Sequence, residues 1–540
     1  MSATPGDLNL ATAWEAVADT AGDLPALAFD GRRTSWERFE DRAARLAGFL
    51  TDHGLGPDAK VALYCYNGPE YSEAQFGAFK ARAVPANVNY RYLGKELAYV
   101  LDNADAQAVF FDHTLAERVD EVRDACPMLR VAVQVGGEEI PDWAVSYEEA
   151  LAAGRMPTVD RSGDDLWFLY TGGTTGSPKA VMWSHRGLFG GMAETFRSLG
   201  EEVPTTAAEA GRISARVVAE GREIRQLCAA PLMHGTSGLT ALATHSHGGM
   251  VATMVSRTFD PEELWDLVEA ERITMVAMVG DAFARPMLES LDDAAARGRS
   301  WDLSSLRLVL SSGVMFSAPL KQRLLDHHRC TIVDTLGSSE GTGMGRQVTS
   351  RSRNDRGTAR FVLGGHTRVF TEDGQEVRPG SGERGRLALG HPLPEGYFKD
   401  PAKTEATFPT IGGRRWSVPG DWATVEADGS IVLLGRGSEC INTGGEKVYP
   451  EEVEEALKVH PAVADCNVVG VDDERWGQAV TAVVQLRESA AVDGEALRSD
   501  VRDRLAGYKV PKRFVFVERI QRLPNGKSDY PWARGVAGAG

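Results

Sequence analysis

The chain has 540 residues, of which 43% are hydrophobic and 25% charged, as in soluble globular proteins. One hydrophobic core does not organise a chain this long, so two or more domains are expected. The formal net charge of -17 argues against general binding to nucleic acid or to an anionic membrane, although a local basic pocket can still bind ATP.

Cysteine usage and hydropathy favour a cytoplasmic protein. The six cysteines are scattered and contain no CxxC pair, which indicates reduced thiols rather than a disulfide or zinc framework. The N-terminal segment MSATPGDLNLATAWEAVADT carries acidic residues and lacks the basic start of a secretory signal. No stretch approaches the roughly 20 apolar residues that span a bilayer, so we expect no membrane insertion.

The N-terminal part of the chain alternates predicted helices and strands. Residues 10–52 are expected to form a helix, a hairpin turn around Asp30 and Gly31, and a second helix capped within 34–37. A helix is then predicted at 71–81, and short buried strands at 61–65, 83–88, 109–111 and 166–170. This alternation predicts an α/β architecture with largely parallel sheets.

The stretch Tyr170–His185, YTGGTTGSPKAVMWSH, supplies the residue types that hold a polyphosphate. Glycines permit a close approach of backbone to ligand, while hydroxyls, backbone N–H groups and one lysine can surround phosphate oxygens. The spacing does not fit a Walker loop. A flexible Gly/Ser/Thr loop is the alternative, but Pro178 and the flanking strand-like segments favour a phosphate cradle. The candidate contacts are Thr171, Gly172, Thr174, Thr175, Gly176 and Lys179.

Several predicted strands in the middle of the chain end in polar loops, where α/β proteins place ligands. These strands lie at 273–279, 306–310 and 331–334, after a polar segment at 200–221 that we interpret as a surface insertion with one short helix. Gly313 follows the second strand. Glu340 follows the third, where a carboxylate near a polyphosphate would suit Mg²⁺, although a solvated loop glutamate is the plainer alternative.

Histidines give weaker signals. His234, in PLMHG after a predicted strand, either lines a pocket or is a hydrogen-bonded loop residue. His245 and His247 form an HxH pair, but no carboxylate or cysteine cluster accompanies them, so we interpret both as structural.

The chain changes character after Arg436. Short helices and strands predicted over 451–505 indicate a compact α+β unit of ~100 residues. We therefore expect a large domain at 1–436 and a small C-terminal domain at 437–540. The terminal GVAGAG is expected to lack fixed structure.

Motifs spread along the chain resemble those of one known group of enzymes. YTGGTTGSPKAV is followed, in order, by LGSSEG, PGDW, GRGSECINTGGEKVYPEEVE and LPNGK. This series resembles the signature of the adenylate-forming superfamily, which includes acyl- and aryl-CoA synthetases, adenylation domains of peptide synthetases and luciferases. The resemblance covers nearly the whole chain. It implies a large domain of stacked, mostly parallel sheets with a β-rich subdomain, and a small mobile domain that rotates between two half-reactions.

The resemblance also implies ligands and residue roles. ATP, Mg²⁺ and CoA are the implied ligands, and Lys527, Glu340 and His234 the implied catalytic residues, with Glu340 on the metal. Asp421 matches the carboxylate that binds the ribose hydroxyls. Ser438 matches the hinge residue about which the small domain rotates. The remaining matches to nucleotide or CoA contacts are Gly313, Leu336, Gly337, Ser338, Ser339, Arg436, Gly444 and Gly445.

The implied reaction is acid–thiol ligation, in which a carboxylate, ATP and CoA give acyl-CoA, AMP and pyrophosphate. Two departures from the family pattern are Ala180, where glycine is usual, and Leu336, where an aromatic residue often stacks on adenine. They leave open a CoA ligase that works mainly on a preformed acyl adenylate. An adenylating enzyme for a carrier protein and a non-catalytic acyl-adenylate-binding protein are further alternatives.

We expect the acid to be bulky and apolar. Small residues would leave volume in its pocket, and methionines adapt to irregular apolar shapes. The long phosphate loop and the 200–221 insertion also resemble actinobacterial ligases for steroid side-chain and terpenoid acids. A homodimer is left open beside a monomer. The predicted pocket residues are His234, Gly235, Gly238, Met278, Val279, Gly280 and Met315.

Overall fold

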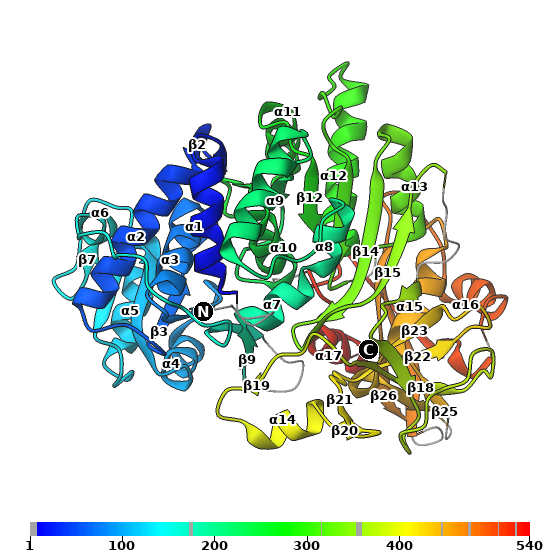
Figure 1. Ribbon diagram of the computed structural model, residues 1–540. Coiled ribbons are helices and arrows are strands. Elements are labelled where there is room, and N and C mark those ends of the chain that lie inside the picture. The colour runs from blue at the N-terminus through cyan, green and yellow to red at the C-terminus, as the bar shows by residue number, and fades with distance from the viewer. Residues whose placement is uncertain are drawn as a thin grey trace.

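A computed structural model describes residues 8–171, 177–314, 316–352, 359–443, 446–473, 477–505, 507–523 and 526–539, with backbone alone at 436, 438, 442 and 447. Within these ranges two large sheets and their helices form the bulk of the molecule, and a smaller sheet lies toward the C-terminus (Figure 1). The same described ranges contain no helix with the length and apolar character needed to cross a bilayer.

The first large sheet has eight strands in the order β19-β9-β8-β4-β3-β5-β6-β7. Strands β8, β4, β3, β5, β6 and β7 pair in parallel, and β9 and β19 add an antiparallel edge. The strands are β3 (Lys60–Tyr64), β4 (Val84–Asn87), β5 (Ala106–Asp112), β6 (Val131–Val135), β7 (Val145–Ser146), β8 (Leu166–Thr171), β9 (Lys179–Ser184) and β19 (Gly396–Tyr397). The helices of this part are α1 (Leu10–Ala21), α2 (Trp36–Asp52), α3 (Pro69–Lys80), α4 (Gly94–Asn103), α5 (Ala116–Arg123), α6 (Tyr147–Leu151), α7 (His185–Gly191) and α8 (Ala193–Ser198).

The second large sheet has thirteen strands in the order β17-β18-β22-β23-β16-β15-β14-β13-β12-β10-β11-β1-β2. The run from β14 through β13, β12, β10 and β11 to β1 is parallel, and the strands beyond either end are antiparallel. The parallel strands are β1 (Pro25–Phe29), β10 (Arg225–Cys228), β11 (Met250–Thr253), β12 (Met275–Met278), β13 (Leu308–Ser312) and β14 (Thr331–Ser338). The others are β2 (Arg32–Ser35), β15 (Gly341–Thr349), β16 (Arg360–Leu363), β17 (Thr367–Phe370), β18 (Arg384–Leu389), β22 (Asp421–Val425) and β23 (Ile431–Arg436).

Six further helices and a short hairpin complete the described residues of this part: α9 (Ala207–Ala219), α10 (Gly235–Ser246), α11 (Pro261–Ala270), α12 (Gly280–Ala296), α13 (Ala318–His327), α14 (Pro401–Thr407), β20 (Thr410–Ile411) and β21 (Arg414–Arg415). Strands alternate with helices in both large sheets, so the predicted α/β class is confirmed. The antiparallel strands β15, β16, β17, β18, β22 and β23 form the β-rich part that the family resemblance implied.

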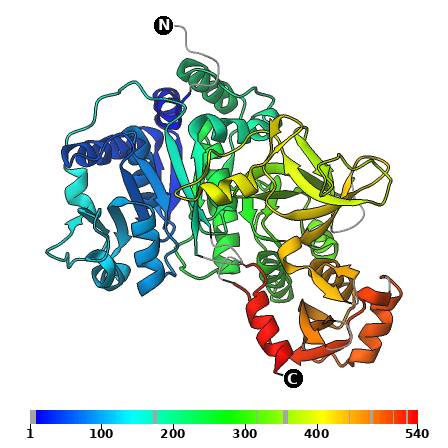
Figure 2. The same cartoon turned by 90° about the horizontal axis from the view of Figure 1, so that it is seen from below.

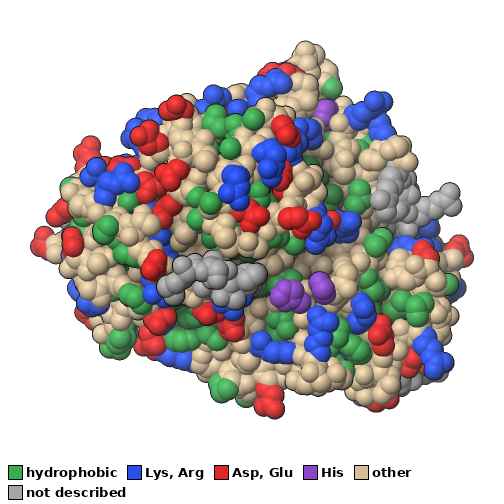
Figure 3. Space-filling model, viewed as in Figure 1, with side chains coloured by type: hydrophobic (Ala, Val, Ile, Leu, Met, Phe, Trp, Pro, Cys, Tyr) green, Lys and Arg blue, Asp and Glu red, His purple; other side chains and the backbone are tan. Residues whose placement is uncertain are grey.

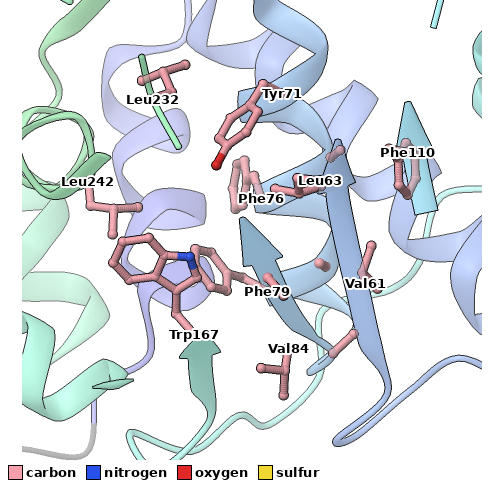
Figure 4. Packing of buried hydrophobic residues seen from close by; sticks show 14 of the residues in the cluster. Val61, Leu63, Tyr71, Phe76, Phe79, Val84, Phe110, Trp167, Leu232 and Leu242 are labelled. Carbon is pink, nitrogen blue, oxygen red and sulfur yellow. The ribbon is translucent and has the colours of Figure 1, made fainter. Parts of the chain in front are cut away.

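Continuous apolar strands form the core of the first sheet, as expected for strands covered on both faces. Trp167 of β8 packs near Phe76 and Phe79 of α3 and near Leu242 of α10, so the core joins helices from both large sheets (Figure 4). The predicted second helix is also present, with Ser35 as its N-cap: the Ser35 hydroxyl accepts a hydrogen bond from the backbone N–H of Arg38.

A smaller unit follows β23 and has its own hydrophobic core (Figure 2). Its sheet has the order β25-β24-β27-β26, and β28 pairs with β27. The elements are β24 (Ile441–Thr443), β25 (Glu446–Val448), α15 (Pro450–Lys458), β26 (Val463–Asp473), β27 (Gly477–Leu486), α16 (Gly494–Arg502), β28 (Arg513–Val517) and α17 (Tyr530–Gly538). This is the small α+β C-terminal domain.

Two expectations were wrong. The 200–221 segment carries the expected helix, α9, but it is not a surface insertion, because α9 packs on α1 and buries Ile213 and Val217. A Cβ on Gly211 would lie 2.9 Å from the carbonyl oxygen of Ala16, so the two helices touch closely there. The terminal GVAGAG was expected to lack structure, but residues up to Gly538 belong to α17, whose Ala537 is buried.

Candidate active site

Asn87, at the carboxyl end of β4, joins the two segments that begin the site. Its Nδ2 donates to the carbonyl oxygens of Tyr170 at 3.0 Å and Met233 at 2.6 Å, and its Oδ1 accepts from the backbone N–H of Tyr170 at 2.6 Å. The side chain is 2% exposed. Asn87 therefore holds the end of β8, where the predicted phosphate loop (residues 171–179, the phosphate-loop segment) begins, next to the loop that contains Met233 and His234 (the His234 loop). The sequence analysis missed it, although a polar residue ending the buried strand VPAN was a usable signal.

His234 directly precedes α10 and presents a buried nitrogen. Among the described residues, no group hydrogen-bonds to its Nε2. Burial, and to a smaller extent the positive charges of Lys527 and Arg91, together lower the pKa of His234 to about 4. The imidazole is consequently neutral at pH 7. A buried polar atom without a protein partner is expected to meet a ligand or water.

Thr171 and Lys179 flank the phosphate-loop segment. They end β8 and begin β9, and they are cross-strand partners in the register of that pair. Lys179 forms an ion pair with Asp400, and hydrogen bonding to Lys179 holds the pKa of this carboxyl below its usual value. Asp400 is the N-cap of α14 and was missed from the sequence, although Asp before Pro is a common helix start. The predicted contacts Gly172, Thr174, Thr175 and Gly176 lie outside the described residues.

Glu340 lies in the turn between β14 and β15, which form an antiparallel hairpin. The hydroxyl of Tyr397 donates to Glu340 Oε1 at 2.7 Å. Trp183 of β9 donates through Nε1 to the carbonyl oxygen of Ser339 at 2.9 Å, and Ser338 Oγ accepts from the Glu340 N–H at 3.2 Å. The hairpin is thereby fixed to the strand that carries Lys179.

The donor set around Glu340 fits Mg²⁺. A single hard carboxylate near a phosphate site is the usual protein contribution, since Mg²⁺ takes its other ligands from phosphates and water. Within the described ranges, no three His, Cys, Asp or Glu side chains gather into a fuller metal cage. Glu340 is the residue that would hold the ion, whose positive charge would offset that of the phosphates.

Two predicted nucleotide contacts on this hairpin also have packing roles. Leu336 faces Gly345 in the strand register and packs against the core of the β-rich part. A Cβ on Gly337 would lie 3.2 Å from the carbonyl oxygen of Gly341, so glycine permits the tight hairpin.

Asp421 and Arg436 are brought together by the pairing of β22 with β23. Asp421 begins β22, Arg436 ends β23, and the two residues are cross-strand partners. Asp421 is 8% exposed. The predicted hinge Ser438 follows in a short 3₁₀ turn, Gly437–Glu439, and the Gly437 N–H donates to the carbonyl oxygen of Gly420 at 3.0 Å.

The loop that carries Lys527 reaches back from the small domain to α12 of the large domain. A Cβ on Gly526 would lie 3.3 Å from Cβ of Ala282 and 3.7 Å from Cγ1 of Val279. Lys527 is near enough to His234 for its charge to lower the pKa of that imidazole. Tertiary structure thus brings Lys527 within electrostatic reach of His234, which lies more than 290 residues earlier in the chain.

The predicted acid-pocket residues separate into different environments. A Cβ on Gly235 would have its nearest neighbours, Leu169 and Leu239, at 3.7 Å, so this position leaves room for a side chain. At Gly238 a Cβ would lie 2.6 Å from the carbonyl oxygen of Leu232, which makes this glycine a packing position. Met278 is fully buried in the core of the second sheet.

Further predicted residues of the acid pocket lie at the carboxyl ends of β12 and β13. Gly313 has φ +89°, and a Cβ there would lie 3.7 Å from Oγ1 of Thr236 and 3.9 Å from Cγ1 of Val279. Gly280 begins α12 with φ +50°, and its N–H donates to Ser311 Oγ at 3.1 Å. Met315, Gly444 and Gly445 lie outside the described residues.

Comparisons with known proteins agree with this arrangement. Residues 14–398 match the family model "AMP-binding enzyme" and residues 452–527 match "AMP-binding enzyme C-terminal domain". The chain is 40% identical over 542 residues to 3-oxocholest-4-en-26-oate--CoA ligase of Rhodococcus rhodochrous, with 98% of this chain and 96% of the relative covered. It is 41% identical over 540 residues, with the same coverage, to a medium/long-chain-fatty-acid--CoA/3-oxocholest-4-en-26-oate--CoA ligase of Mycobacterium tuberculosis strain H37Rv.

The fold is also that of solved ligases. The crystal structure of the anthranilate CoA ligase AuaEII with anthranoyl-AMP superposes with a TM-score of 0.83 at 20% identity, covering 99% of this chain and 98% of that one. A benzoate CoA ligase from Burkholderia xenovorans gives a TM-score of 0.79 at 23% identity, covering 98% and 100%. At these identities the likeness concerns the fold alone.

The chain therefore belongs to the AMP-binding enzyme family, the adenylate-forming group that its motifs resembled. Within this family it is an acyl-CoA ligase, an acid–thiol ligase that uses ATP, Mg²⁺ and CoA and passes through an acyl adenylate. The carrier-protein, preformed-adenylate and non-catalytic alternatives are not favoured.

Proposed function

We propose that the acid is bulky and apolar, of the steroid side-chain or medium- to long-chain type. The observation that carries this proposal is the 40% identity, over 98% of the chain, to a ligase named for 3-oxocholest-4-en-26-oate. The side chains next to two predicted pocket glycines support it, because Leu169 and Leu239 flank Gly235, and Val279 flanks Gly313 together with Thr236. Apolar walls of this kind bind ligands mainly through burial of apolar surface.

In the first half-reaction we propose that Lys527 stabilises the charge that develops when the acid's carboxylate oxygen attacks the α-phosphorus of ATP. A P–O bond then forms, the bond to the β-phosphate oxygen breaks, and pyrophosphate leaves. His234 remains neutral and offers Nε2 as a polar contact beside the carboxylate. No protein nucleophile is needed, since positioning and electrostatic stabilisation dominate such transfers. Asp421 would bind the ribose hydroxyls. The phosphates would be bound by Thr171 and Lys179.

In the second half-reaction the CoA sulfur attacks the acyl carbon, the C–O bond to AMP breaks, and the thiol proton is lost to solvent. We propose that the small domain, residues 437–540, rotates about Ser438 to present Gly444 and Gly445 to the pantetheine arm. The family motifs support this assignment. We also place the protein in the cytoplasm, because its six scattered cysteines include no CxxC pair, as in proteins with reduced thiols. A homodimer stays a prediction that light scattering after size-exclusion chromatography would test.

The departure at Ala180 gives no reason to favour a preformed adenylate as substrate. Ala180 is fully buried in β9, pairs with Tyr170, and accepts a hydrogen bond from the Phe398 N–H at 3.0 Å. Its Cβ thus occupies an ordinary strand position. We expect ATP-dependent turnover to be intact.

A library of carboxylic acids, incubated with enzyme, ATP, Mg²⁺ and CoA, tests the substrate class by mass spectrometry of the thioesters. We expect steroid side-chain acids or medium- and long-chain acids to exceed acetate and amino acids. Gly235→Leu should narrow the site and shift the preference toward shorter acids, whereas Gly235→Ala should leave it unchanged. A wild-type enzyme that prefers acetate or an amino acid would refute the proposal.

A further inference from the structure

The loop carrying Lys527 is preceded by an arginine in a largely buried ion cluster. Arg522 donates to Asp465 of β26 with both arms of its guanidinium, through Nη2 to Oδ1 at 2.6 Å and through Nε to Oδ2 at 2.8 Å. Lys458 of α15 lies 3.2 Å from the same carboxylate. The three side chains are only 16%, 21% and 15% exposed. This two-point geometry fixes the orientation of the arginine as well as its position.

The same arginine is tied to the loop. Arg522 Nη1 lies 3.4 Å from the carbonyl oxygen of Gly526, at the outer limit of a hydrogen bond. Backbone hydrogen bonds join the described residues at the two ends of the loop: the Leu523 N–H donates to the Lys527 carbonyl oxygen at 2.8 Å, and the Gly526 N–H donates to the Leu523 carbonyl oxygen at 2.8 Å. Arg522 and Ser528 also form an isolated β-bridge across its base. The position of Arg522 therefore determines where the turn leaves the small domain.

Stability alone is a poor explanation for this cluster. Removing charges from water is costly, and apolar residues of similar volume often stabilise a protein as well as a buried ion pair does. Burial raises the pKa of Asp465, but the charges of Lys458 and Arg522 outweigh burial and hold it well below its usual range. The cluster is ionised at neutral pH, so its geometry is maintained while the enzyme works.

A carboxylate of the large domain lies near enough to Arg522 to act on its charge. Asp281, in the first turn of α12, is 9% exposed and accepts a hydrogen bond from the Ser317 N–H at 2.7 Å. Burial lowers the pKa of Arg522, but the charges of Asp465, Glu454 and Asp281 together outweigh burial and raise it. Asp281 lies directly before Ala282, on which Gly526 rests. This attraction exists only while the Lys527 loop lies on α12.

We propose that Arg522 is a positioning residue for adenylation: clamped by Asp465 and attracted by Asp281, it holds the Lys527 loop against α12. Arg522 does not touch the reacting groups itself. The inference rests on the proposed role of Lys527 and goes beyond it, because it names the residues that place that lysine. It predicts a defect confined to the half-reaction that needs Lys527 at the site.

The test separates the two half-reactions in the full-length enzyme, with an acid that the thioester screen identifies. Acyl-adenylate formation is followed by pyrophosphate exchange into ATP, and thioester formation by mass spectrometry from chemically prepared acyl-AMP and CoA. Arg522→Met should lower adenylation by about 10-fold to 100-fold, since a displacement of about 1 Å can cost 100-fold. Thioester formation from acyl-AMP should persist. Arg522→Lys keeps the charge but loses the two-point contact, so it should recover only part of the rate.

Two further variants identify the cause. Asp281→Asn keeps an acceptor for the Ser317 N–H and should lower adenylation alone. Arg498 is a matched control on α16, because it also binds carbonyl oxygens of the small domain, those of Pro511 at 3.2 Å and Lys512 at 2.9 Å, away from the Lys527 loop. Arg498→Met should reduce thermal stability as much as Arg522→Met does while leaving the ratio of the two half-reactions unchanged.

The outcomes also distinguish this inference from the proposal beneath it. If Lys527→Ala retains adenylation, the proposed role of Lys527 fails and this inference with it. Two results for Arg522→Met would refute the positioning role of Arg522 alone, given that Lys527→Ala loses adenylation. The first is that Arg522→Met retains adenylation, and the second is that it loses both half-reactions to the same extent.

Discussion

Replacing Asn87 with alanine should both destabilise the large domain and impair adenylation. The substitution removes three hydrogen bonds of 2.6–3.0 Å and leaves the N–H and C=O of Tyr170 and the C=O of Met233 without the amide that now binds them. Each bond contributes about 1 kcal/mol net, and an unsatisfied buried partner costs about 1–3 kcal/mol, so we expect a total loss of about 3–5 kcal/mol. The side chain is almost fully buried, and water is poorly placed to compensate.

Urea unfolding, monitored by tryptophan fluorescence at the transition of the large domain, measures how much Asn87→Ala lowers the free energy of unfolding. Pyrophosphate exchange measures the second effect, a raised KM for ATP, because Asn87 joins the phosphate-loop segment to the His234 loop. Asn67 is the matched control: it accepts from the Leu232 N–H at 2.8 Å and contacts the Ala230 carbonyl oxygen at 3.4 Å, but does not bind Tyr170. Asn67→Ala should cost about 1 kcal/mol and leave the KM for ATP unchanged. A loss below about 1 kcal/mol for Asn87→Ala would refute the reasoning.

Three other predictions concern the same site. Gly238→Ala should destabilise the protein by about 1–3 kcal/mol, because the added Cβ would lie 2.6 Å from the Leu232 carbonyl oxygen. The pKa of His234 is about 4 in the folded protein, below its unfolded value of about 6.5; the unfolded state therefore binds more protons, and stability falls by up to about 3 kcal/mol as pH drops from about 6.5 to about 4. Unfolding measured against pH should show this loss reduced in His234→Gln. Tyr397→Phe removes the 2.7 Å hydrogen bond to Glu340 and should raise the Mg²⁺ concentration for half-maximal adenylation by about 10-fold or more.

Each of these has a contrary result. Gly235→Ala is the control for Gly238, since its Cβ has 3.7 Å of room, and equal destabilisation by both would remove the packing argument. Identical pH profiles for His234→Gln and wild type would show that other groups carry the acid sensitivity. If the Mg²⁺ dependence of adenylation is unchanged in Tyr397→Phe, the assignment of Glu340 as the Mg²⁺ ligand is contradicted.

Features that depend on neighbouring residues were predictable from the sequence alone. Ser35 caps α2 because the hydrogen bond joins it to Arg38, three residues away. The apolar strands of the parallel sheets and the family motifs are likewise local patterns, and the motifs occur in the family's order. They were sufficient for the α/β class, the small C-terminal domain and the acyl-CoA ligase activity.

The arrangement of the site was decided by contacts between distant segments. Asn87 binds Met233 across 146 positions, and Lys179 pairs with Asp400 across 221, so no local pattern singles out either partner. The same reason explains the two errors. The polar composition of 200–221 could not show that α1 offers an apolar face to α9, and the glycine-rich terminus gave no sign that Ala533 and Ala537 would pack against Val469 and Val483. A chain of this composition specifies its elements locally, but which buried surfaces meet depends on the free energy of the whole packed structure.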